Sequence, residues 1–278
     1  MRKVKTGIIG IGNMGTSHAI NLTEDHCPEM ELTAVADTSP ERRAWAKDNL
    51  PGVCVYGTAE ELLDSGRIEA VIIAVPHYFH PVYAIEAFKR GIHVMSEKPA
   101  GVYTRQVREM NKAAAESGVV FGLMFNQRTD HIYRKMRELV TSGKFGQIRR
   151  SNWLITNWYR PQAYYDSGSW RATWSGEGGG VLLNQCPHNL DLWQWICGMP
   201  TAITAKMCFG RWHDIEVEDD VIVKRMSGRR ICPNCGRTYH VDNNPPEKEG
   251  VCGECESGLI IRADDEPETV AARLETYH

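Results

Sequence analysis

The first 125 residues alternate between short apolar runs and amphipathic stretches. The apolar runs are rich in β-branched residues and predict strands at residues 6–10, 32–37, 70–75, 93–96 and 119–125. The stretches between them have the spacing of helices, at residues 14–24, 40–49, 81–90 and 104–117. Pro40 and Pro81 fall where the first turn of a helix tolerates proline. This alternation is typical of a doubly wound parallel α/β sheet.

Beyond residue 126 the pattern changes twice. Aromatic residues become frequent, and we predict helices at 129–141 and 187–197 with strands at 148–159, 201–211 and 221–223. After residue 223 the composition shifts abruptly to Cys, Gly, Pro and charged residues. We therefore predict a doubly wound domain at 1–126, an α+β domain with an incomplete open sheet at 127–223, and a small module at 224–278.

Composition excludes several classes of protein. A net charge of −3, from 32 basic and 35 acidic residues, gives no overall field that would attract nucleic acid or an anionic membrane. The longest apolar run, residues 70–75, is far too short to span a bilayer, and no export signal precedes the first strand. We expect a cytoplasmic globular protein whose partner is a small molecule.

A glycine-rich motif joins the first predicted strand to the first helix. Residues 10–15 read G-x-G-x-x-G, in which Gly10 permits a tight turn, Gly12 lets the backbone approach a pyrophosphate, and Gly15 lets the helix pack closely on the strand. Asp37 ends the next strand, 22 residues after Gly15, where a carboxylate can bind ribose hydroxyls. The alternative is a merely structural turn, but strand, motif, helix and acid in this order favour a dinucleotide site.

The same residues bear on the choice of cofactor. The charge of Asp37 would repel a 2′-phosphate and so favours NAD over NADP. Arg42 and Arg43 keep NADP open, because either could bind that phosphate, although both also fit a solvated helix face.

A Glu97-Lys98-Pro99 triplet follows the predicted strand at 93–96. Open α/β sheets bind their ligands at this carboxyl edge, so Lys98 could orient a substrate hydroxyl or stabilise an alkoxide there. Such a triplet can also be an ordinary surface turn. Its place at the end of this strand favours the functional interpretation.

These motifs together resemble the family that includes glucose–fructose oxidoreductase and inositol dehydrogenase (Gfo/Idh/MocA). The resemblance rests on residues 7–15, Ala36-Asp37, Glu97-Lys98-Pro99 and residues 178–192, and it covers residues 4–223. It implies a Rossmann domain followed by an α/β domain with an open, largely antiparallel sheet. It also implies NAD(P)-dependent hydride transfer to or from a sugar, polyol or related hydroxyl compound. If that sheet were whole, the resemblance would further imply a homo-oligomer assembled through it.

The resemblance assigns site residues. Family members carry Asp-x-x-x-His at positions that match Asn184 and His188, with the histidine in proton transfer and the lysine of the Glu-Lys-Pro motif assisting. The candidate catalytic residues are therefore Lys98, Asn184 and His188. The candidate cofactor-binding residues are Gly10, Gly12, Asn13, Met14, Gly15, Asp37, Pro76, His80, Glu97 and Lys98.

Asn184 departs from the family pattern. Its amide can only donate or accept hydrogen bonds, whereas an imidazole with a reference pKa of ~6.5 can exchange the hydroxyl proton. We infer that Asn184 positions the substrate and His188 titrates. The alternative for His188 is a cap on the helix that follows it.

Aromatic residues between positions 158 and 174 have two interpretations. They could form a platform for a sugar ring, or they could be core residues, as such residues more often are. We retain Tyr159, Tyr164 and Arg160 as candidate substrate contacts. The full set is Trp158, Tyr159, Tyr164, Tyr165, Trp170 and Trp174.

Four cysteines near the C-terminus have the spacing of a zinc site. Cys232, Cys235, Cys252 and Cys255 form C-x2-C-x16-C-x2-C, which offers four thiolates to one tetrahedral ion. Four thiolates leave no position for a catalytic water, so the zinc would be structural. The surrounding module has almost no apolar core and would gain its folding free energy from the metal.

Residues 221–278 resemble the zinc-bearing lid domain of adenylate kinase. In that family the arginines that match Arg225, Arg229, Arg262 and Arg273 close over nucleotide phosphates, which suits their forked guanidinium groups. The sequence nowhere reads G-x-x-x-x-G-K-[ST], so a kinase core is absent.

The two resemblances meet near residue 221 without a linker, which suggests a fusion of two unrelated coding segments. Three hypotheses follow: an NAD(P)-dependent dehydrogenase, a nucleotide-phosphate binding protein that uses the zinc lid, or a fusion chain that holds the cofactor without turnover.

Overall fold

The computed structural model describes residues 2–155, 159–168, 170–206, 223–224, 226–242 and 244–275, with the backbone alone for 273–275. The chain forms two compact units, each considered by itself. The first comprises Met1–Val102, Gln106–Leu154 and Gly180–Thr201, and the second comprises Tyr103–Arg105, Ile155–Gly179 and Ala202–His278. No helix among the described residues is long and apolar enough to cross a membrane.

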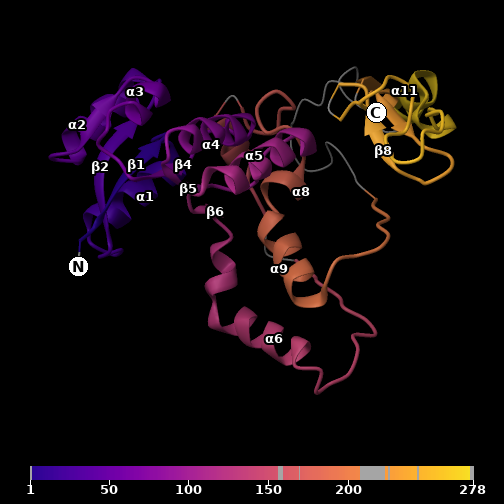
Figure 1. Cartoon of the computed structure of the whole chain (residues 1–278), viewed down its shortest axis with the longest axis horizontal. Coiled ribbons are helices and arrows are strands. Elements are labelled where there is room, and N and C mark those ends of the chain that lie inside the picture. Colours follow the sequence, from indigo (N-terminus) through magenta and orange to yellow (C-terminus); the bar gives the residue numbers. More distant parts are fainter. Residues whose placement is uncertain are drawn as a thin grey trace. The chain divides into compact units, whose positions relative to one another are not determined.

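A six-stranded parallel sheet forms the core of the first unit (Figure 1). The strand order is β3-β2-β1-β4-β5-β6, and every pair is parallel. This order reverses direction between β1 and β4, the point where doubly wound sheets bind nucleotides. The strands are β1 (Val4–Ile9), β2 (Met30–Ala36), β3 (Cys54–Tyr56), β4 (Ala70–Ile73), β5 (His93–Ser96) and β6 (Phe121–Leu123).

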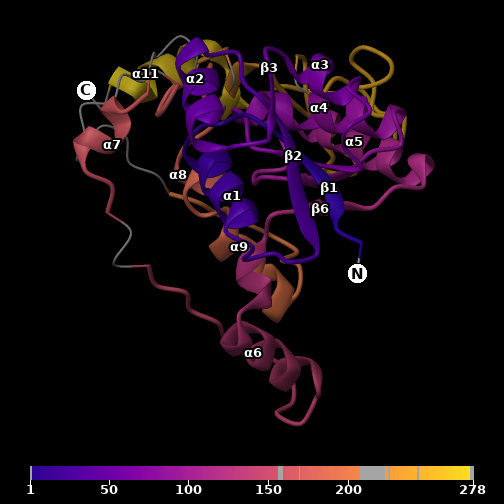
Figure 2. The same cartoon turned by 90° about the vertical axis from the view of Figure 1, so that its left-hand side faces the viewer.

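Helices cover both faces of the sheet, and Figure 2 shows the sheet between them. Alternate residues of one strand serve opposite faces, because side chains alternate along a strand. Ile8 packs with residues of α1 and α2, whereas Ile9 packs with residues of α3 and α4. The helices are α1 (Asn13–Thr23), α2 (Pro40–Asn49), α3 (Ala59–Leu63), α4 (His80–Lys89) and α5 (Thr104–Ser117).

The doubly wound domain predicted from the sequence is confirmed, and two short elements extend it. Strand β3 and helix α3 were not expected, because three and five residues are too short for a clear hydrophobic period. A local signal for α3 does exist. Thr58 and Glu61 form a capping box, in which Thr58 accepts from the backbone N–H of Glu61 and Glu61 accepts from that of Thr58.

The region after β6 differs from the expected open sheet. Residues 148–155, Tyr159 and residues 201–206 form no strand, and Val223 is helical; the rest of the expected strands lies outside the described residues. A strand needs a neighbour to pair its backbone N–H and C=O groups, and the described part of this region has none. Its elements are η2 (Asn126–Thr129), α6 (His131–Thr141), α7 (Gln162–Asp166), α8 (Val181–Asn184) and α9 (Pro187–Cys197).

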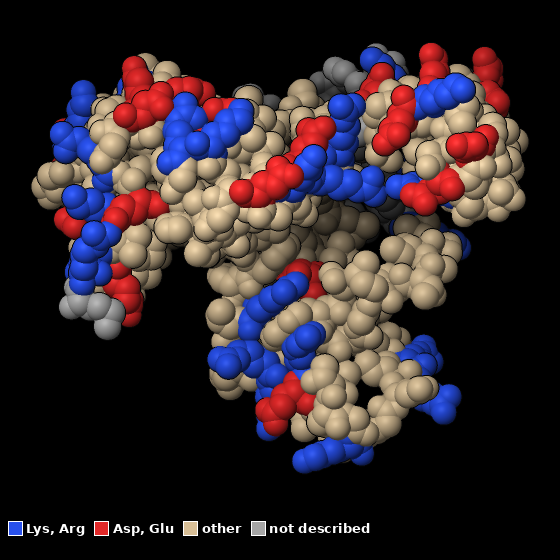
Figure 3. All heavy atoms as spheres, in the orientation of Figure 1, with Lys and Arg blue, Asp and Glu red and all other residues tan. Residues whose placement is uncertain are grey.

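Helix α6 packs against α9 and keeps much of its apolar side exposed. Ile132, Met136 and Leu139 are 56%, 42% and 39% exposed. On the face shown in Figure 3, Lys and Arg gather around α6, whereas the two signs of charge are mixed over the rest of that face. Monomeric proteins rarely leave such an apolar surface open, and within the described residues this side of α6 lacks cover.

The C-terminal module is small and has little apolar core. Strands β7 (Arg229–Ile231) and β8 (Thr238–His240) form an antiparallel pair, followed by η3 (Ala263–Asp265) and α11 (Pro267–Glu275). Its buried cluster consists of Cys232, Tyr239 and Cys252. A core this small cannot supply the folding free energy of a domain, so the module needs another source of stability.

Candidate active site and metal centre

The glycine turn between β1 and α1 is shaped by close packing at two of its three glycines. Gly10 has φ +90°, and a Cβ there would lie 2.6 Å from the carbonyl oxygen of Ala74. A Cβ on Gly15 would lie 1.8 Å from the carbonyl oxygen of Gly10. Only glycine fits either position, which is the role the sequence predicts for each.

Gly12 lies in open space instead. No atom lies within 4 Å of the position that its Cβ would take. It is the N-cap of α1, provides no side-chain cap, and is followed by exposed Asn13 and Met14. An uncapped helix N-terminus with an open approach is the arrangement that holds a pyrophosphate, so the turn fits a dinucleotide.

Alanine substitutions should separate the two kinds of glycine. Gly12→Ala should leave the free energy of unfolding nearly unchanged and weaken NADH binding about 10-fold or more, because the methyl group enters the phosphate approach. Gly15→Ala should lower the free energy of unfolding by about 1–3 kcal/mol, because the methyl group collides with backbone. Chemical denaturation and NADH fluorescence titration measure both. Gly258→Ala, also in open space but in the C-terminal module, is the control and should change neither.

Asp37 holds the glycine turn in place. Its carboxylate accepts hydrogen bonds from the backbone N–H of Ile11 at 2.7 Å and of Ser39 at 2.8 Å. A carboxylate has about four acceptor positions, so capacity for ribose hydroxyls is left. The position of Asp37 in the sequence predicts only the ribose role.

The two arginines of α2 differ from one another. Arg43 donates to the carbonyl oxygens of Asp37 and Thr38, both at 2.8 Å, whereas Arg42 is exposed. Arg43 therefore stabilises the carboxyl end of β2, and only Arg42 has the solvated position expected of both.

Lys98 contacts the segment that carries the other two candidate catalytic residues. Its Nζ donates to the backbone carbonyl of Asn184, the last residue of α8, at 2.9 Å. Asn184 is buried, and His188 follows on the first turn of α9. The fold thus brings Lys98, Asn184 and His188 together at the carboxyl edge of β5.

His188 has a buried nitrogen without a partner. Among the described residues no group hydrogen-bonds its Nδ1, and the ring of Phe125 meets the imidazole edge-on at 6.0 Å. Burial lowers the pKa of His188 below 6.5, and the charge of Lys98 lowers it further, against smaller opposite effects of Glu97 and Asp191. A neutral imidazole with an unused nitrogen suits proton transfer better than the helix cap considered as the alternative.

His80 is enclosed rather than open to a cofactor. It is 1% exposed, and its ring nitrogens lie 2.7 Å from the carbonyl oxygen of Pro99 and 2.8 Å from that of Val75. Burial lowers the pKa of His80. The ring therefore ties the loop after β4 to the turn after β5, while the neighbouring Pro76 is exposed.

Glu97 is also buried, and it pairs with His18, which is not among the residues predicted for the site. Its carboxylate lies 2.8 Å from Nε2 of His18 on α1. Burial raises the pKa of Glu97, but the hydrogen bond and charge of His18 and the backbone N–H of Lys98 outweigh it, so the pKa lies below its ordinary value. The position of His18, one turn after Gly15, was the available signal.

The candidate aromatic platform lies in the second unit. Arg171, which was not singled out, donates to the hydroxyl of Tyr164 at 2.6 Å and stacks over its ring at 4.1 Å. Arg160 lies 5.2 Å from the same ring, and Tyr159 is 69% exposed. Tyr165, Trp170 and Trp174 are partly buried, and Trp158 lies outside the described residues.

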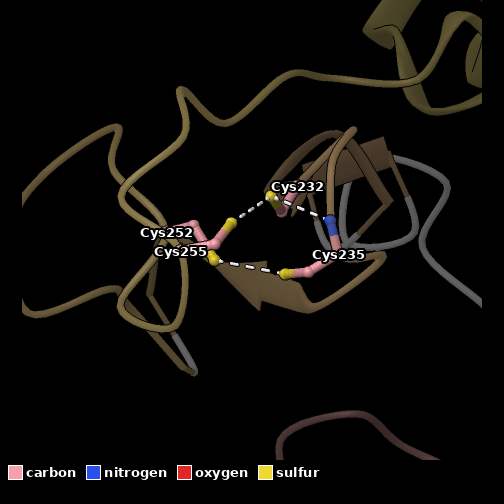
Figure 4. A group of neighbouring side chains, drawn as sticks. All are labelled: Cys232, Cys235, Cys252 and Cys255. Carbon is pink, nitrogen blue, oxygen red and sulfur yellow. Dashed lines mark hydrogen bonds between the residues drawn. The ribbon is translucent and has the colours of Figure 1, made fainter.

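The four cysteines converge on one point. Their Sγ atoms all lie within 4.8 Å of one another, with Cys232 3.3 Å from Cys255 and Cys235 3.5 Å from Cys252 (Figure 4). Such a cluster of sulfur atoms fits the tetrahedral coordination that Zn²⁺ adopts with four thiolates. The predicted ligand set is therefore brought together by the fold.

Two matched turns present these cysteines. In each turn, the backbone N–H of the first cysteine donates to the carbonyl oxygen of the residue five positions later. The carbonyl oxygen of that cysteine accepts from the backbone N–H of the residue four positions later. That fourth residue has positive φ, namely Gly236 (+73°) and Glu256 (+57°). The hydroxyl of Tyr239 lies 3.3 Å from Sγ of Cys252, and the Ser257 hydroxyl lowers the pKa of Cys255 to about 5. Both contacts favour thiolates, the form that binds zinc.

The structure describes the side chains of two of the four arginines that are predicted to bind phosphate. Arg229 lies 3.8 Å from Asp265, and Arg262 is exposed beside η3. Arg225 and the side chain of Arg273 lie outside the described residues.

Three family models match the chain in succession. Residues 4–125 match the oxidoreductase family with an NAD-binding Rossmann fold, and residues 133–228 match the GFO/IDH/MocA C-terminal domain. Residues 229–264 match the active-site lid of adenylate kinase. The last two matches meet at residues 228 and 229, close to the junction that the sequence predicts.

Individual relatives divide in the same way. A 1-carboxy-3-chloro-3,4-dihydroxycyclohexa-1,5-diene dehydrogenase of Comamonas testosteroni is 28% identical over 211 residues, 75% of this chain and 51% of that protein. The adenylate kinase of Ruminiclostridium cellulolyticum is 61% identical over 64 residues, 23% of this chain and 30% of the kinase. The chain thus spans about half of the dehydrogenase and less than a third of the kinase.

Solved structures resemble the oxidoreductase part. The WlbA dehydrogenase of Bordetella pertussis, in complex with NADH and UDP-GlcNAcA, has a TM-score of 0.63 and 31% identity over 71% of this chain and 58% of that one. The scyllo-inositol dehydrogenase of Lactobacillus casei, with bound NAD(H) and scyllo-inositol, has a TM-score of 0.60 and 30% identity over 71% and 57%.

Proposed function

Because residues 4–125 and 133–228 match both domain models of one NAD-binding oxidoreductase family, we propose that this chain is an NAD(P)-dependent oxidoreductase. It transfers a hydride between a nicotinamide cofactor and a sugar, polyol or related hydroxyl compound. The observation that carries the proposal is the hydrogen bond between Lys98 Nζ and the backbone of Asn184, which joins the Glu-Lys-Pro turn to the segment that bears His188.

The substrate class is supported by the solved neighbours. Their bound ligands, UDP-GlcNAcA and scyllo-inositol, are hydroxyl-bearing rings. NAD is the proposed cofactor, because Asp37 directly follows β2, where a 2′-phosphate would meet its negative charge. Arg42, exposed nearby, is the residue through which NADP could still bind.

Each residue of the site has a distinct part in the proposed reaction. Bound nicotinamide would accept or supply the hydride. Gly12 and the N-terminus of α1 hold the diphosphate, and Lys98 orients the substrate hydroxyl and stabilises negative charge on its oxygen. His188 accepts the hydroxyl proton at Nδ1, while the Asn184 amide positions the substrate by hydrogen bonds alone.

The pKa of His188 predicts how the reaction depends on pH. Alcohol oxidation needs the neutral imidazole, and the pKa of His188 lies below 6.5. The rate should therefore be level near pH 7 and fall only below pH 6.5, as the imidazole becomes protonated. A profile of kcat/KM for oxidation measures this. An acid limb centred above 6.5, or one that persists in His188→Gln, would contradict the assignment.

The proposed function itself is tested by binding and turnover of the full chain. NADH fluorescence titration should show binding, more tightly than NADPH, and a panel of sugars, sugar acids and polyols should include a compound oxidised with NAD. Absence of NADH binding would overturn the proposal. NADH binding without turnover across the panel would favour a chain that holds the cofactor without catalysis.

The C-terminal module supports a second candidate function. We propose that Cys232, Cys235, Cys252 and Cys255 hold one structural zinc ion, and that Arg229 and Arg262 of this lid-like module bind nucleotide phosphates. Calorimetric titration with ATP tests the second part, and no heat of binding at millimolar ATP would exclude it. Phosphoryl transfer is not proposed, since the sequence has no phosphate-binding loop of a kinase.

A further inference from the structure

An ion pair between η2 and α9 lies beside His188. Arg128 Nε donates to Oδ2 of Asp191 at 2.7 Å, and a second guanidinium N–H donates to the other carboxylate oxygen. We propose that Arg128 and Asp191 are positioning residues that hold the His188 imidazole with an unused nitrogen for proton transfer. This inference rests on the proposed oxidoreductase function.

This ion pair is expected to contribute little to the net stability of the fold. The Asp191 side chain is 8% exposed and that of Arg128 38%, so the carboxylate has lost most of its hydration. Buried ion pairs often contribute little net stability, because desolvation offsets the attraction. Their best-supported benefit is the selection of one geometry, here that of α9 relative to η2.

The ion pair connects the two groups that lie next to His188, namely Asp191 on the same helix and the ring of Phe125. Asp191 lies three residues after His188, so the two side chains share a face of α9. The Arg128 guanidinium lies 5.8 Å from the centre of the Phe125 ring, which in turn meets the His188 ring edge-on. Arg128 therefore links the helix that carries the imidazole to the aromatic ring that packs against it.

Arg128 also keeps the Asp191 carboxylate from accepting a hydrogen bond from the His188 imidazole. A carboxylate one helical turn from an imidazole is a ready hydrogen-bond acceptor for it, but the two-pronged contact with Arg128 fixes the direction in which the Asp191 carboxylate faces. This accounts for the buried Nδ1 of His188 without a partner among the described residues. The charged groups that act on the imidazole are Lys98, Glu97 and Asp191, of which Lys98 lowers its pKa and the two carboxylates raise it.

The test uses the full chain and two readouts. The first is the pKa of His188, from NMR titration of ¹³C-histidine-labelled protein, with the signal assigned by His188→Gln. The second is steady-state kinetics with NAD and the best substrate. Arg128→Met should raise the pKa of His188 by about 0.5 or more, because Asp191 becomes available to the imidazole. It should also lower kcat about 10-fold or more without weakening NADH binding.

Asp191→Asn should shift the pKa of His188 the opposite way, to a lower value, because a negative charge is lost. Arg128→Lys keeps the charge but loses the two-pronged contact, and should recover only part of the kcat. The controls are Arg108→Met and Asp48→Asn, exposed residues on α5 and α2, which should leave the pKa and kcat unchanged.

A purely structural role predicts a different result. Arg128→Met would then lower the melting temperature and leave the pKa of His188 within about 0.2 of the original, which would overturn the inference. The NMR titration needs no turnover, so it decides the positioning role even if the wild-type chain proves inactive. Should Arg128→Met fail to fold, the milder Arg128→Lys takes its place in the titration.

Discussion

Replacing Lys98 with methionine is expected to lower kcat/KM about 10³-fold while leaving NADH affinity within about twofold. Methionine keeps the length and apolar stem of lysine but has no charge and no donor. The ammonium group donates to the Asn184 carbonyl at 2.9 Å, which holds it beside the segment that bears His188, and Lys98→Met removes its charge and its N–H donors. Loss of those donors removes stabilisation that matters mainly in the transition state, so kcat should fall more than KM rises.

A second readout distinguishes loss of chemistry from loss of fold. The charge of Lys98 lowers the pKa of His188, so Lys98→Met should raise that pKa. Lys47→Met, at an exposed site on α2, is the matched control. Turnover unchanged in Lys98→Met would show that the lysine is not catalytic, and lost NADH binding would show that it holds the cofactor instead.

Removal of the metal should unfold the C-terminal module and leave the nucleotide-binding fold intact. Structural zinc contributes on the order of 10 kcal/mol in small four-ligand modules, far more than a core of Cys232, Tyr239 and Cys252 can supply. Chelation, or Cys252→Ser, should therefore expose residues 226–272 to proteolysis. Metal analysis should fall from one zinc per chain to none.

The control for this experiment is Cys27→Ser. Cys27 is half-buried against the core of the first unit, far in sequence from the cluster, and its loss should not change the zinc content. NADH binding should persist after chelation, because the glycine turn belongs to the first unit and the four cysteines to the second. A chain that keeps one zinc in Cys252→Ser, or resists proteolysis after chelation, would contradict a structural four-thiolate site.

Several features of the molecule were predictable because their signals are local. The parallel sheet follows from the alternation of β-branched runs with helical spacing, and the turn at residues 10–15 follows from where its glycines stand. The cluster of four cysteines follows from the spacing of two cysteine pairs. The prediction of strands at 148–155 and 201–206 was wrong, because a strand also needs a neighbouring strand to pair with. The spacing of residues along one segment does not reveal such a partner.

The sequence by itself thus determined the kind of fold, the glycine turn and the cluster of four cysteines, since each depends on contacts within a few residues or on a fixed spacing. Only the tertiary structure decided which distant residues meet. His18 and Glu97 are 79 residues apart, Lys98 and Asn184 are 86 apart, and Arg128 and Asp191 are 63 apart. No periodicity relates such positions; they come together because parallel strands deliver their carboxyl ends to one edge, and α8 and α9 pack there.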